Sequence, residues 1–340
     1  MRKRYWAGAA VAAIAADLYL FNASWLATPP ATRPLLQAHR GDYQRYDRTG
    51  LSNDTCTATR IFKPTNAYLE NTLPSMAKAF KDGADVVELD VQPTTDHQFA
   101  VFHDWTLDCR TDGHGVTRDH SMAELKALDI GYGYTYDGGR TFPFRGRFKG
   151  AMPTLDEVLK AFPGKHILIN IKSNDPAEGD ALDAYLTRIG EVNDPRLSVY
   201  GGDKPIARLQ ISRPEMRPFS VASIKACGYG YIALGWTGYM PKACQNTTLY
   251  LPMNMTWMLW GYPNRLQARF AAAGSYIYLL GPQKGKVGLQ GVNNTAELGR
   301  VPASWRMGIL TDNIETAGPW FQARVAKETA KSAAIPPSEE

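Results

Sequence analysis

Several features that would point to a function class are absent from this chain of 340 residues. It contains no Cys-x-x-Cys pair, so a zinc site of the usual spacing is not expected. No repeat and no long linker follow residue 34. The formal net charge is only +5, of which Arg2, Lys3 and Arg4 supply three, and no Lys/Arg run with interleaved aromatic residues occurs further on. We therefore expect no nucleic-acid partner.

The overall composition is that of an ordinary folded protein. Hydrophobic residues make up 44% of the chain and charged residues 21%, which is enough apolar material for a packed core. The length fits one large domain or two small ones.

The first 30 residues have the pattern of an export or anchoring segment. The basic cluster precedes an uncharged stretch over 5–16, which is typical of a signal sequence or a membrane anchor. Trp25 occupies the position where a signal cleavage site needs a small residue, which favours an uncleaved anchor. Asp17 opposes this choice, because a mid-bilayer carboxylate costs about 2.5–3.5 kcal/mol. The alternative is a buried N-terminal helix. We expect a membrane-anchored protein facing the periplasm or cell exterior, or a secreted one.

Four cysteines are present, and three disulfide connectivities are possible. Cys56 and Cys109 follow strands whose ends should lie at one rim of the molecule, whereas Cys227 and Cys244 are close in sequence. We predict the pairs Cys56–Cys109 and Cys227–Cys244 in an exported chain. None of the four lies in a motif that indicates a thiol nucleophile.

Short apolar runs that resemble strands alternate with helical patterns along the chain. Such alternation over about 280 residues predicts an α/β fold, a TIM (β/α)8-type barrel over 34–325, with a doubly wound sheet as the alternative. Residues 326–340 are expected to form a disordered tail. The predicted strands are 34–38, 85–91, 99–102, 166–171, 197–200, 217–221, 248–253, 276–280 and 307–310, and the predicted helices include 73–81, 121–128, 155–162, 177–189 and 263–273.

The ends of these strands carry the polar residues that could perform chemistry. His39 and Arg40 close the first strand, where an imidazole can transfer a proton and a guanidinium can bind an anion. Glu88 and Asp90 alternate with apolar residues, so both lie on one face of a strand and could bind a hard cation such as Mg²⁺ or Ca²⁺. A solvated strand face is the alternative explanation for this acidic pair.

A second histidine is placed near the acidic pair by a predicted hairpin. The link 93–98 is too short for a crossover helix, so the following run should pair antiparallel with the strand that carries Asp90. With a four-residue turn at 95–98, Asp90 would lie opposite His103. A histidine opposite a metal-binding carboxylate is a candidate for catalysis.

Together these motifs resemble those of the glycerophosphodiester phosphodiesterases. The resemblance covers about 35–315 and rests on the order of short motifs, which are His39-Arg40-Gly41, Glu70-Asn71-Thr72, Gly83-Ala84-Asp85, Glu88-Leu89-Asp90-Val91, His103-Asp104, Thr111-Asp112-Gly113-His114-Gly115, Pro153-Thr154-Leu155 and Gly308-Ile309-Leu310-Thr311-Asp312.

The resemblance implies a TIM barrel and a role for each matched residue. The family cleaves glycerophosphodiesters to glycerol 3-phosphate and an alcohol with a divalent cation and two histidines. By this resemblance, His39 and His103 are the acid–base pair, and Arg40 and Lys172 bind the phosphate. The implied metal ligands are Glu88, Asp90, Glu70 and Asn170. The partners would be a small-molecule or lipid phosphodiester substrate and, through the N-terminus, a membrane.

One departure from the family pattern concerns the metal. The fourth strand of the family usually reads Glu-Ile-Lys, whereas this chain has Asn170 where that glutamate stands. The stretch 201–260 also departs, because few family residues match there. Two other functions therefore stay open. One is a phospholipase D-like lyase of the sphingomyelinase D type, and the other is a barrel that binds phosphate or lipid without catalysis.

Overall fold

Eight parallel strands form the centre of the protein in a computed structural model, which describes residues 2–52, 55–283 and 289–333. Neighbouring strands along the chain pair with one another except β6 and β7, and the last strand pairs with the first. No strand pairing joins β6 to β7 within the described residues, so the barrel is nearly closed. The strands are β1 (Leu36–His39), β2 (Val86–Pro93), β4 (His166–Ile171), β5 (Leu197–Gly201), β6 (Phe219–Ser220), β7 (Thr248–Pro252), β8 (Tyr276–Leu280) and β9 (Gly308–Thr311).

Side chains of alternate strand residues fill two separate cores. Val87, Leu89 and Val91 of β2 point outward and belong to the main core between strands and helices. Val86 and Leu168 belong to a second cluster with aromatic residues of β6, β7 and β8. Because Glu88 and Asp90 have the same parity as Val86, they share the inner face of the barrel, as the sequence predicted.

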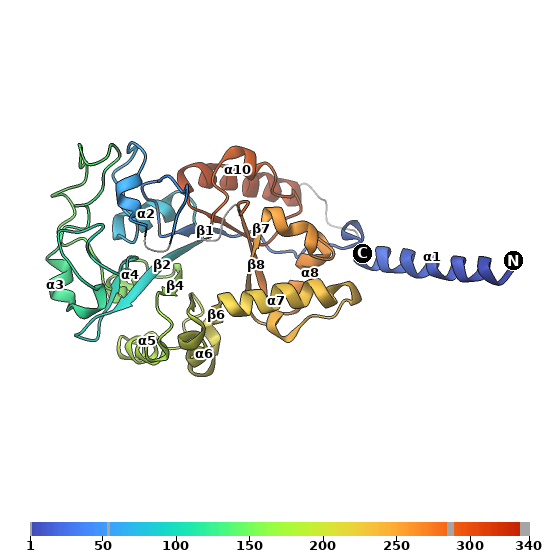
Figure 1. Ribbon diagram of the computed structural model, residues 1–340. Helices are drawn as coiled ribbons and strands as arrows, with labels where there is room; N and C mark the ends of the chain where they lie inside the picture. Colours follow the sequence, from blue (N-terminus) through green and yellow to red (C-terminus); the bar gives the residue numbers. More distant parts are fainter. Residues whose placement is uncertain (1, 53–54, 284–288, 334–340) are drawn as a thin grey trace.

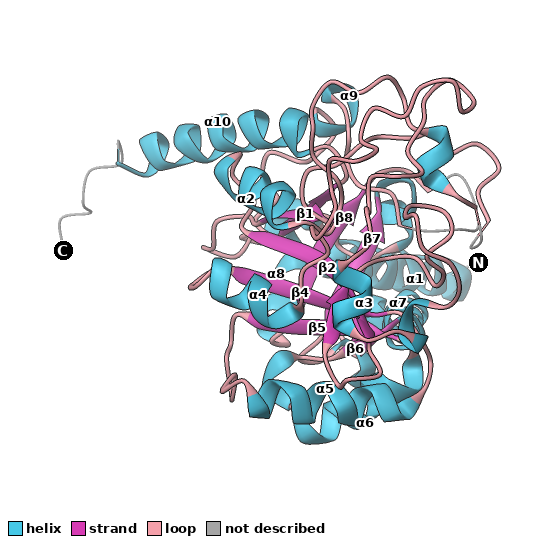
Figure 2. Ribbon diagram, turned by 90° about the vertical axis from the view of Figure 1, so that its left-hand side faces the viewer, coloured by secondary structure: helices cyan, strands magenta, loops and turns pink. Residues whose placement is uncertain are grey.

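Helices surround these strands (Figure 2). Several begin with a hydroxyl cap, since the Thr72 side chain accepts a hydrogen bond from Ser75 N and the Thr154 side chain accepts one from Glu157 N. The helices are α1 (Arg2–Asn22), α2 (Leu73–Lys81), α3 (Met122–Lys126), α4 (Leu155–Ala161), α5 (Pro176–Arg188), α6 (Asp203–Ser212), α7 (Val221–Leu234), α8 (Asn264–Ala272), α9 (Thr295–Leu298) and α10 (Ile314–Ala333).

The parallel barrel confirms the TIM-type α/β prediction and rules out the doubly wound sheet. Every predicted strand is present to within two residues at its start, and each predicted helix has a counterpart. The ninth strand, β3 (Phe99–Val101), pairs antiparallel with β2 outside the barrel, as the short link required.

The predicted register of this hairpin is wrong by one residue. Pro93 pairs with Phe99 and Val91 with Val101, so Phe102 rather than His103 follows opposite Asp90, and Phe102 N donates to the Asp90 carbonyl at 3.0 Å. The turn has three residues instead of four, because His97 adopts a positive φ of 59° and Thr94 N bonds to the Gln98 carbonyl.

Both ends of the described chain are helical. Helix α1 projects away from the barrel (Figure 1) rather than being buried. None of the helices in the described part of the chain is long and apolar enough to cross a membrane. At the other end, α10 continues to Ala333, so 326–333 are helical where a disordered tail was predicted, and 334–340 lie outside the described residues.

Both predicted disulfides are present. Cys56 joins Cys109, which links the loop after β1 to the segment after β3, and Cys227 of α7 joins Cys244. The described cysteines are therefore all paired.

Candidate active site

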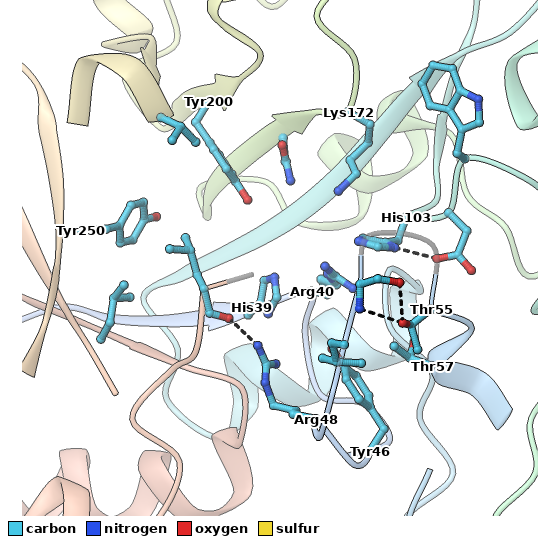
Figure 3. Close-up of a pocket in the computed structure, with 18 of the residues that line it drawn as sticks. His39, Arg40, Tyr46, Arg48, Thr55, Thr57, His103, Lys172, Tyr200 and Tyr250 are labelled. Carbon is cyan, nitrogen blue, oxygen red and sulfur yellow. Dashed lines mark hydrogen bonds and ion pairs between the residues drawn. The ribbon is translucent and has the colours of Figure 1, made fainter. Parts of the chain in front are cut away.

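The carboxyl ends of the strands surround a cavity of about 890 Å³. His39, Arg40, His103, Lys172 and Asn170 all line it, so the barrel brings together five of the eight site residues that the sequence predicted. Figure 3 shows the two histidines, Arg40 and Lys172 around this cavity. The other three, Glu70, Glu88 and Asp90, are buried beneath it.

His39 is held in place by the strand that closes the barrel. Its Nδ1 lies 2.6 Å from Asp312 Oδ1, and Asp312 follows β9, the parallel neighbour of β1. The Asp312 carboxylate also accepts from Asn293 Nδ2 at 2.9 Å and from Gly291 N at 2.8 Å. Burial alone would raise the pKa of Asp312, but its hydrogen bond with His39 holds that pKa below the usual value.

His103 has a similar carboxylate partner. Its Nδ1 lies 2.6 Å from Asp104 Oδ1, and Asp104 Oδ2 accepts from Arg110 Nε at 2.8 Å. Burial, together with the positive charges of Arg40 and Lys172, lowers the pKa of His103 to about 4. His103 is therefore neutral near pH 7 and is able to accept a proton.

Two cations balance the buried acids below the cavity. Arg40 Nε lies 3.1 Å from Asp90 Oδ2, and Lys172 Nζ lies 3.3 Å from Asp90 Oδ1. Burial would raise the pKa of Asp90, but Arg40 and Lys172 hold it well below the usual value. Glu70 is likewise paired, with Arg40 at 3.0 Å and Arg110 at 3.2 Å.

Glu88 has a different environment from its neighbour Asp90. It accepts from the Tyr200 hydroxyl at 2.9 Å and from Arg40 N at 3.2 Å, and His39 Nε2 lies 3.8 Å away. Burial and the charge of Asp90 raise the pKa of Glu88. Asp90 therefore stays ionised at lower pH than Glu88 does.

The expected metal ligands are adjacent, but they do not form a metal site in this arrangement. Asn170 pairs with Asp90 across β2 and β4, and its Nδ2 donates to Asp90 Oδ1 at 2.8 Å. Asn71 Nδ2 donates to the other oxygen at 2.9 Å, so the Asp90 carboxylate is fully engaged. In the described part of the chain, no group of three or more His, Cys, Asp or Glu side chains could hold a metal ion.

These residues form no metal site because β4 carries Asn170 where the family usually has a glutamate. Asn170 supplies an amide N–H donor where a second carboxylate would have repelled Asp90 and attracted a cation. The positive charge next to Asp90 comes instead from Arg40 and Lys172.

Several residues of the site were not singled out as functional by the sequence. These are Asp104, Asp312, Arg110, Asn71 and Tyr200. Two of them had a usable signal, because Asp104 directly follows His103 and Asp312 ends the strand that must lie beside the first strand in a closed barrel.

Comparison with known proteins agrees with this geometry. The model of the glycerophosphoryl diester phosphodiesterase family matches residues 39–216, which are 178 of the 340 residues. A glycerophosphodiester phosphodiesterase of Caldanaerobacter subterraneus is 38% identical over 105 residues, which are 30% of this chain and 39% of that protein. One of Bacillus subtilis is 38% identical over 110 residues, 32% of this chain and 36% of its own. The chain thus covers about two fifths of the length of these relatives.

Solved structures share the fold. The glycerophosphoryl diester phosphodiesterase domain of an uncharacterized Mycobacterium tuberculosis protein has a TM-score of 0.61 at 17% identity, covering 85% of this chain and 99% of that one. An Oleispira antarctica phosphodiesterase in complex with the product sn-glycerol-3-phosphate has a TM-score of 0.53 at 17% identity, covering 86% and 97%.

Proposed function

Because the chain belongs to the glycerophosphoryl diester phosphodiesterase family, we propose that it hydrolyses glycerophosphodiesters or related lipid-headgroup phosphodiesters to glycerol 3-phosphate and an alcohol. The observation that carries this proposal is the pair of imidazoles at one cavity, each bonded through Nδ1 to a carboxylate. Such a bond orients the ring and leaves Nε2 available for proton transfer.

The roles of the two histidines follow from their surroundings. Neutral His103 accepts the proton of the attacking water as the new P–O bond forms. His39 then donates a proton to the leaving alcohol oxygen as the old P–O bond breaks. The Asp312 carboxylate, 2.6 Å from the His39 ring, balances the charge of the imidazolium.

The cations next to Asp90 suit the phosphate. Arg40 and Lys172 both line the cavity, where they can bind the phosphodiester anion and the charge that develops on its oxygens. No step of this scheme passes through a metal ion, because the residues at Asp90 do not leave ligands open for one.

Product analysis tests the proposal. The purified protein is incubated with glycerophosphocholine, glycerophosphoethanolamine and a lysophospholipid, each with EDTA, Mg²⁺ or Ca²⁺. We expect glycerol 3-phosphate as the product, whereas a cyclic phosphate would indicate the lyase. Absence of turnover with all three substrates under every condition would contradict the proposal and favour a non-catalytic barrel.

The two histidine variants make this test specific to the site. His39→Ala and His103→Ala should each lower turnover by about 10²–10⁴-fold, the usual contribution of a general acid or base. His166→Ala is the matched control, because this exposed residue begins β4 at the opposite end of the barrel and should leave turnover unchanged. Wild-type turnover in either active-site variant would refute the assignment.

We also propose that the chain is exported. Disulfides persist mainly in oxidising compartments, and both cysteine pairs are bonded. The role of residues 1–30 as signal or anchor is part of this proposal. A fusion of the full chain to alkaline phosphatase, expressed in a Gram-negative host, should be active, since that enzyme needs its own disulfides. An inactive fusion would count against export.

A further inference from the structure

Large hydrophobic side chains are exposed mainly in two segments of the protein. Of the 22 that are exposed among the described residues, 17 lie in 6–26 or in 221–260. Nine of these 17 side chains are aromatic, and we call the set the aromatic face. They include Trp25, Tyr229, Trp236, Tyr239, Trp257 and Trp260, with Trp257 81% exposed and Tyr229 68% exposed. Exposed apolar surface on this scale marks a binding surface rather than ordinary solvent contact.

The segments that form the aromatic face are packed together. Asn22 at the end of α1 donates from Nδ2 to the Trp236 carbonyl at 2.9 Å. Arg269 of α8 donates from Nη1 to Asn22 Oδ1 at 3.0 Å and to the Gly235 carbonyl at 2.8 Å. These bonds join α1 to the end of α7 and to α8, so α1 extends the surface outward from the barrel (Figure 1).

Basic residues outnumber acidic ones in this region. No Asp or Glu occurs between Glu215 and Glu297, whereas five Lys or Arg residues lie in the described part of the same stretch. The first 31 residues contain only one acid, Asp17. Exposed Lys242 belongs to this acid-free stretch and lies close to the disulfide that ties α7 to residue 244. Asp203 of α6 also contacts α7, since its Oδ1 accepts from Ala222 N at 3.3 Å. A surface that combines exposed aromatic rings with an excess of positive charge is complementary to anionic lipid headgroups.

We propose that the aromatic face docks onto the surface of an anionic lipid bilayer. Tryptophan and tyrosine favour the headgroup region, where the ring is buried and its polar atom stays hydrated. Helix α7 also links this face to the cavity, since Val221, Ile224 and Lys225 in its first turns line it. The inference concerns binding and does not depend on the proposed hydrolysis.

Vesicle sedimentation with the full chain tests how much the aromatic side chains contribute to membrane binding. Vesicles of phosphatidylcholine alone are compared with vesicles that also contain phosphatidylglycerol. The double variant Trp257→Ser/Tyr229→Ser should bind about tenfold more weakly or worse, because two large apolar side chains no longer leave water. The matched control is Ile211→Ser/Phe62→Ser, which removes side chains that are 81% and 57% exposed outside the aromatic face and should bind as the wild type does.

A charge reversal tests the electrostatic part independently. Lys242→Glu should weaken binding to the vesicles with phosphatidylglycerol by about fivefold or more and leave binding to phosphatidylcholine unchanged. Lys204→Glu on α6 is the control, because Lys204 is also exposed but lies outside the acid-free stretch.

Three results would overturn the proposal. The first is no binding of the wild type to phosphatidylglycerol vesicles, and the second is unchanged binding of the Trp257→Ser/Tyr229→Ser variant. The third is a dimer in sedimentation velocity that this variant loses and the control keeps, because a second copy of the chain would then cover the aromatic face.

Discussion

The surroundings of His103 favour its neutral form. Burial and the cations Arg40 and Lys172 lower its pKa to about 4. The neutral imidazole therefore persists from neutral pH down into moderately acidic solution. If His103 is the base, kcat/KM should be retained well below pH 6.5, the region in which an unperturbed histidine becomes protonated.

Removing one of these cations should move the acidic limb of the pH profile. Lys172→Met leaves less positive charge near His103, so its pKa should rise toward the usual value, and the loss of kcat/KM on acidification should begin at higher pH. The measurement is kcat/KM for a glycerophosphodiester between pH 4 and 8. Lys160→Met on the outer surface is the control, and an unmoved or lowered limb in the Lys172 variant would exclude His103 as the titrating base.

The residue at position 170 determines whether a second carboxylate lies opposite Asp90, where the two could bind a cation. Asn170→Glu would place an acid opposite Asp90, and the repulsion between the two should be relieved by a divalent ion. We expect Ca²⁺ or Mg²⁺ to raise the Tm of this variant more than that of the wild type, whose residues form no metal site in the described part of the chain. Asn170→Ala adds no carboxylate and should show no larger rise in Tm than the wild type.

The control at this position is Asn170→Gln, which keeps the amide and should titrate as the wild type does. Superimposable metal titrations for the wild type and all three variants would mean that residue 170 does not influence cation binding.

At the scale of elements, the two disulfides hold loops of different size. Cys56 and Cys109 are separated by 53 residues, and Cys227 and Cys244 by 17. In the chain-entropy treatment, the larger loop contributes about 4 kcal/mol to stability and the smaller about 3 kcal/mol. Cys56→Ala/Cys109→Ala should therefore lower the free energy of unfolding more than Cys227→Ala/Cys244→Ala does, measured by urea denaturation.

The same pair of variants should differ in substrate binding. Cys56, Cys109 and residues next to them, such as Thr57, line the cavity, whereas Cys227 and Cys244 are fully buried in the main core. We expect KM to rise only in the variant that lacks Cys56 and Cys109. Equal effects of the two variants on stability and KM would contradict this ranking.

At the scale of the whole molecule, the barrel is incomplete at one place. Strand β6 pairs only with β5, and β7 only with β8, among the described residues. Helix α7 contacts both of these edge strands. The unpaired edges of β6 and β7 thus lie next to α7, which also lines the cavity and carries part of the aromatic face.

Hydrogen exchange should detect the missing strand pairing between β6 and β7. Amides of Phe219 and Ser220 in β6 should exchange faster than those of β2 and β4, because β2 and β4 have paired neighbours on both sides and open only with the whole barrel. Native-state exchange followed by mass spectrometry or NMR measures this difference. Uniform protection across all eight strands would indicate that the barrel closes fully in solution.

The sequence by itself determined the type of fold and most of the predicted site residues that line the cavity. Apolar runs of strand length alternating with capped helices can bury their apolar faces in a parallel barrel, and the polar residues at the strand ends must then meet at one rim. His39, Arg40 and His103 were predicted in this way, and Lys172 through resemblance to a family whose motifs occur in the same order. The pair Cys56–Cys109 followed from a shared rim, and the pair Cys227–Cys244 from closeness in sequence.

Only the tertiary structure decided the partners of these residues. The pairing of His39 with Asp312 joins strands 273 residues apart, and no local pattern encodes it. The hairpin register depended on one backbone torsion, at His97, which shifted the pairing by one residue. Whether Asp90 binds a cation depended on four donor side chains from three separate segments. Such contacts arise because packing brings distant side chains together, and burial then sets their charges.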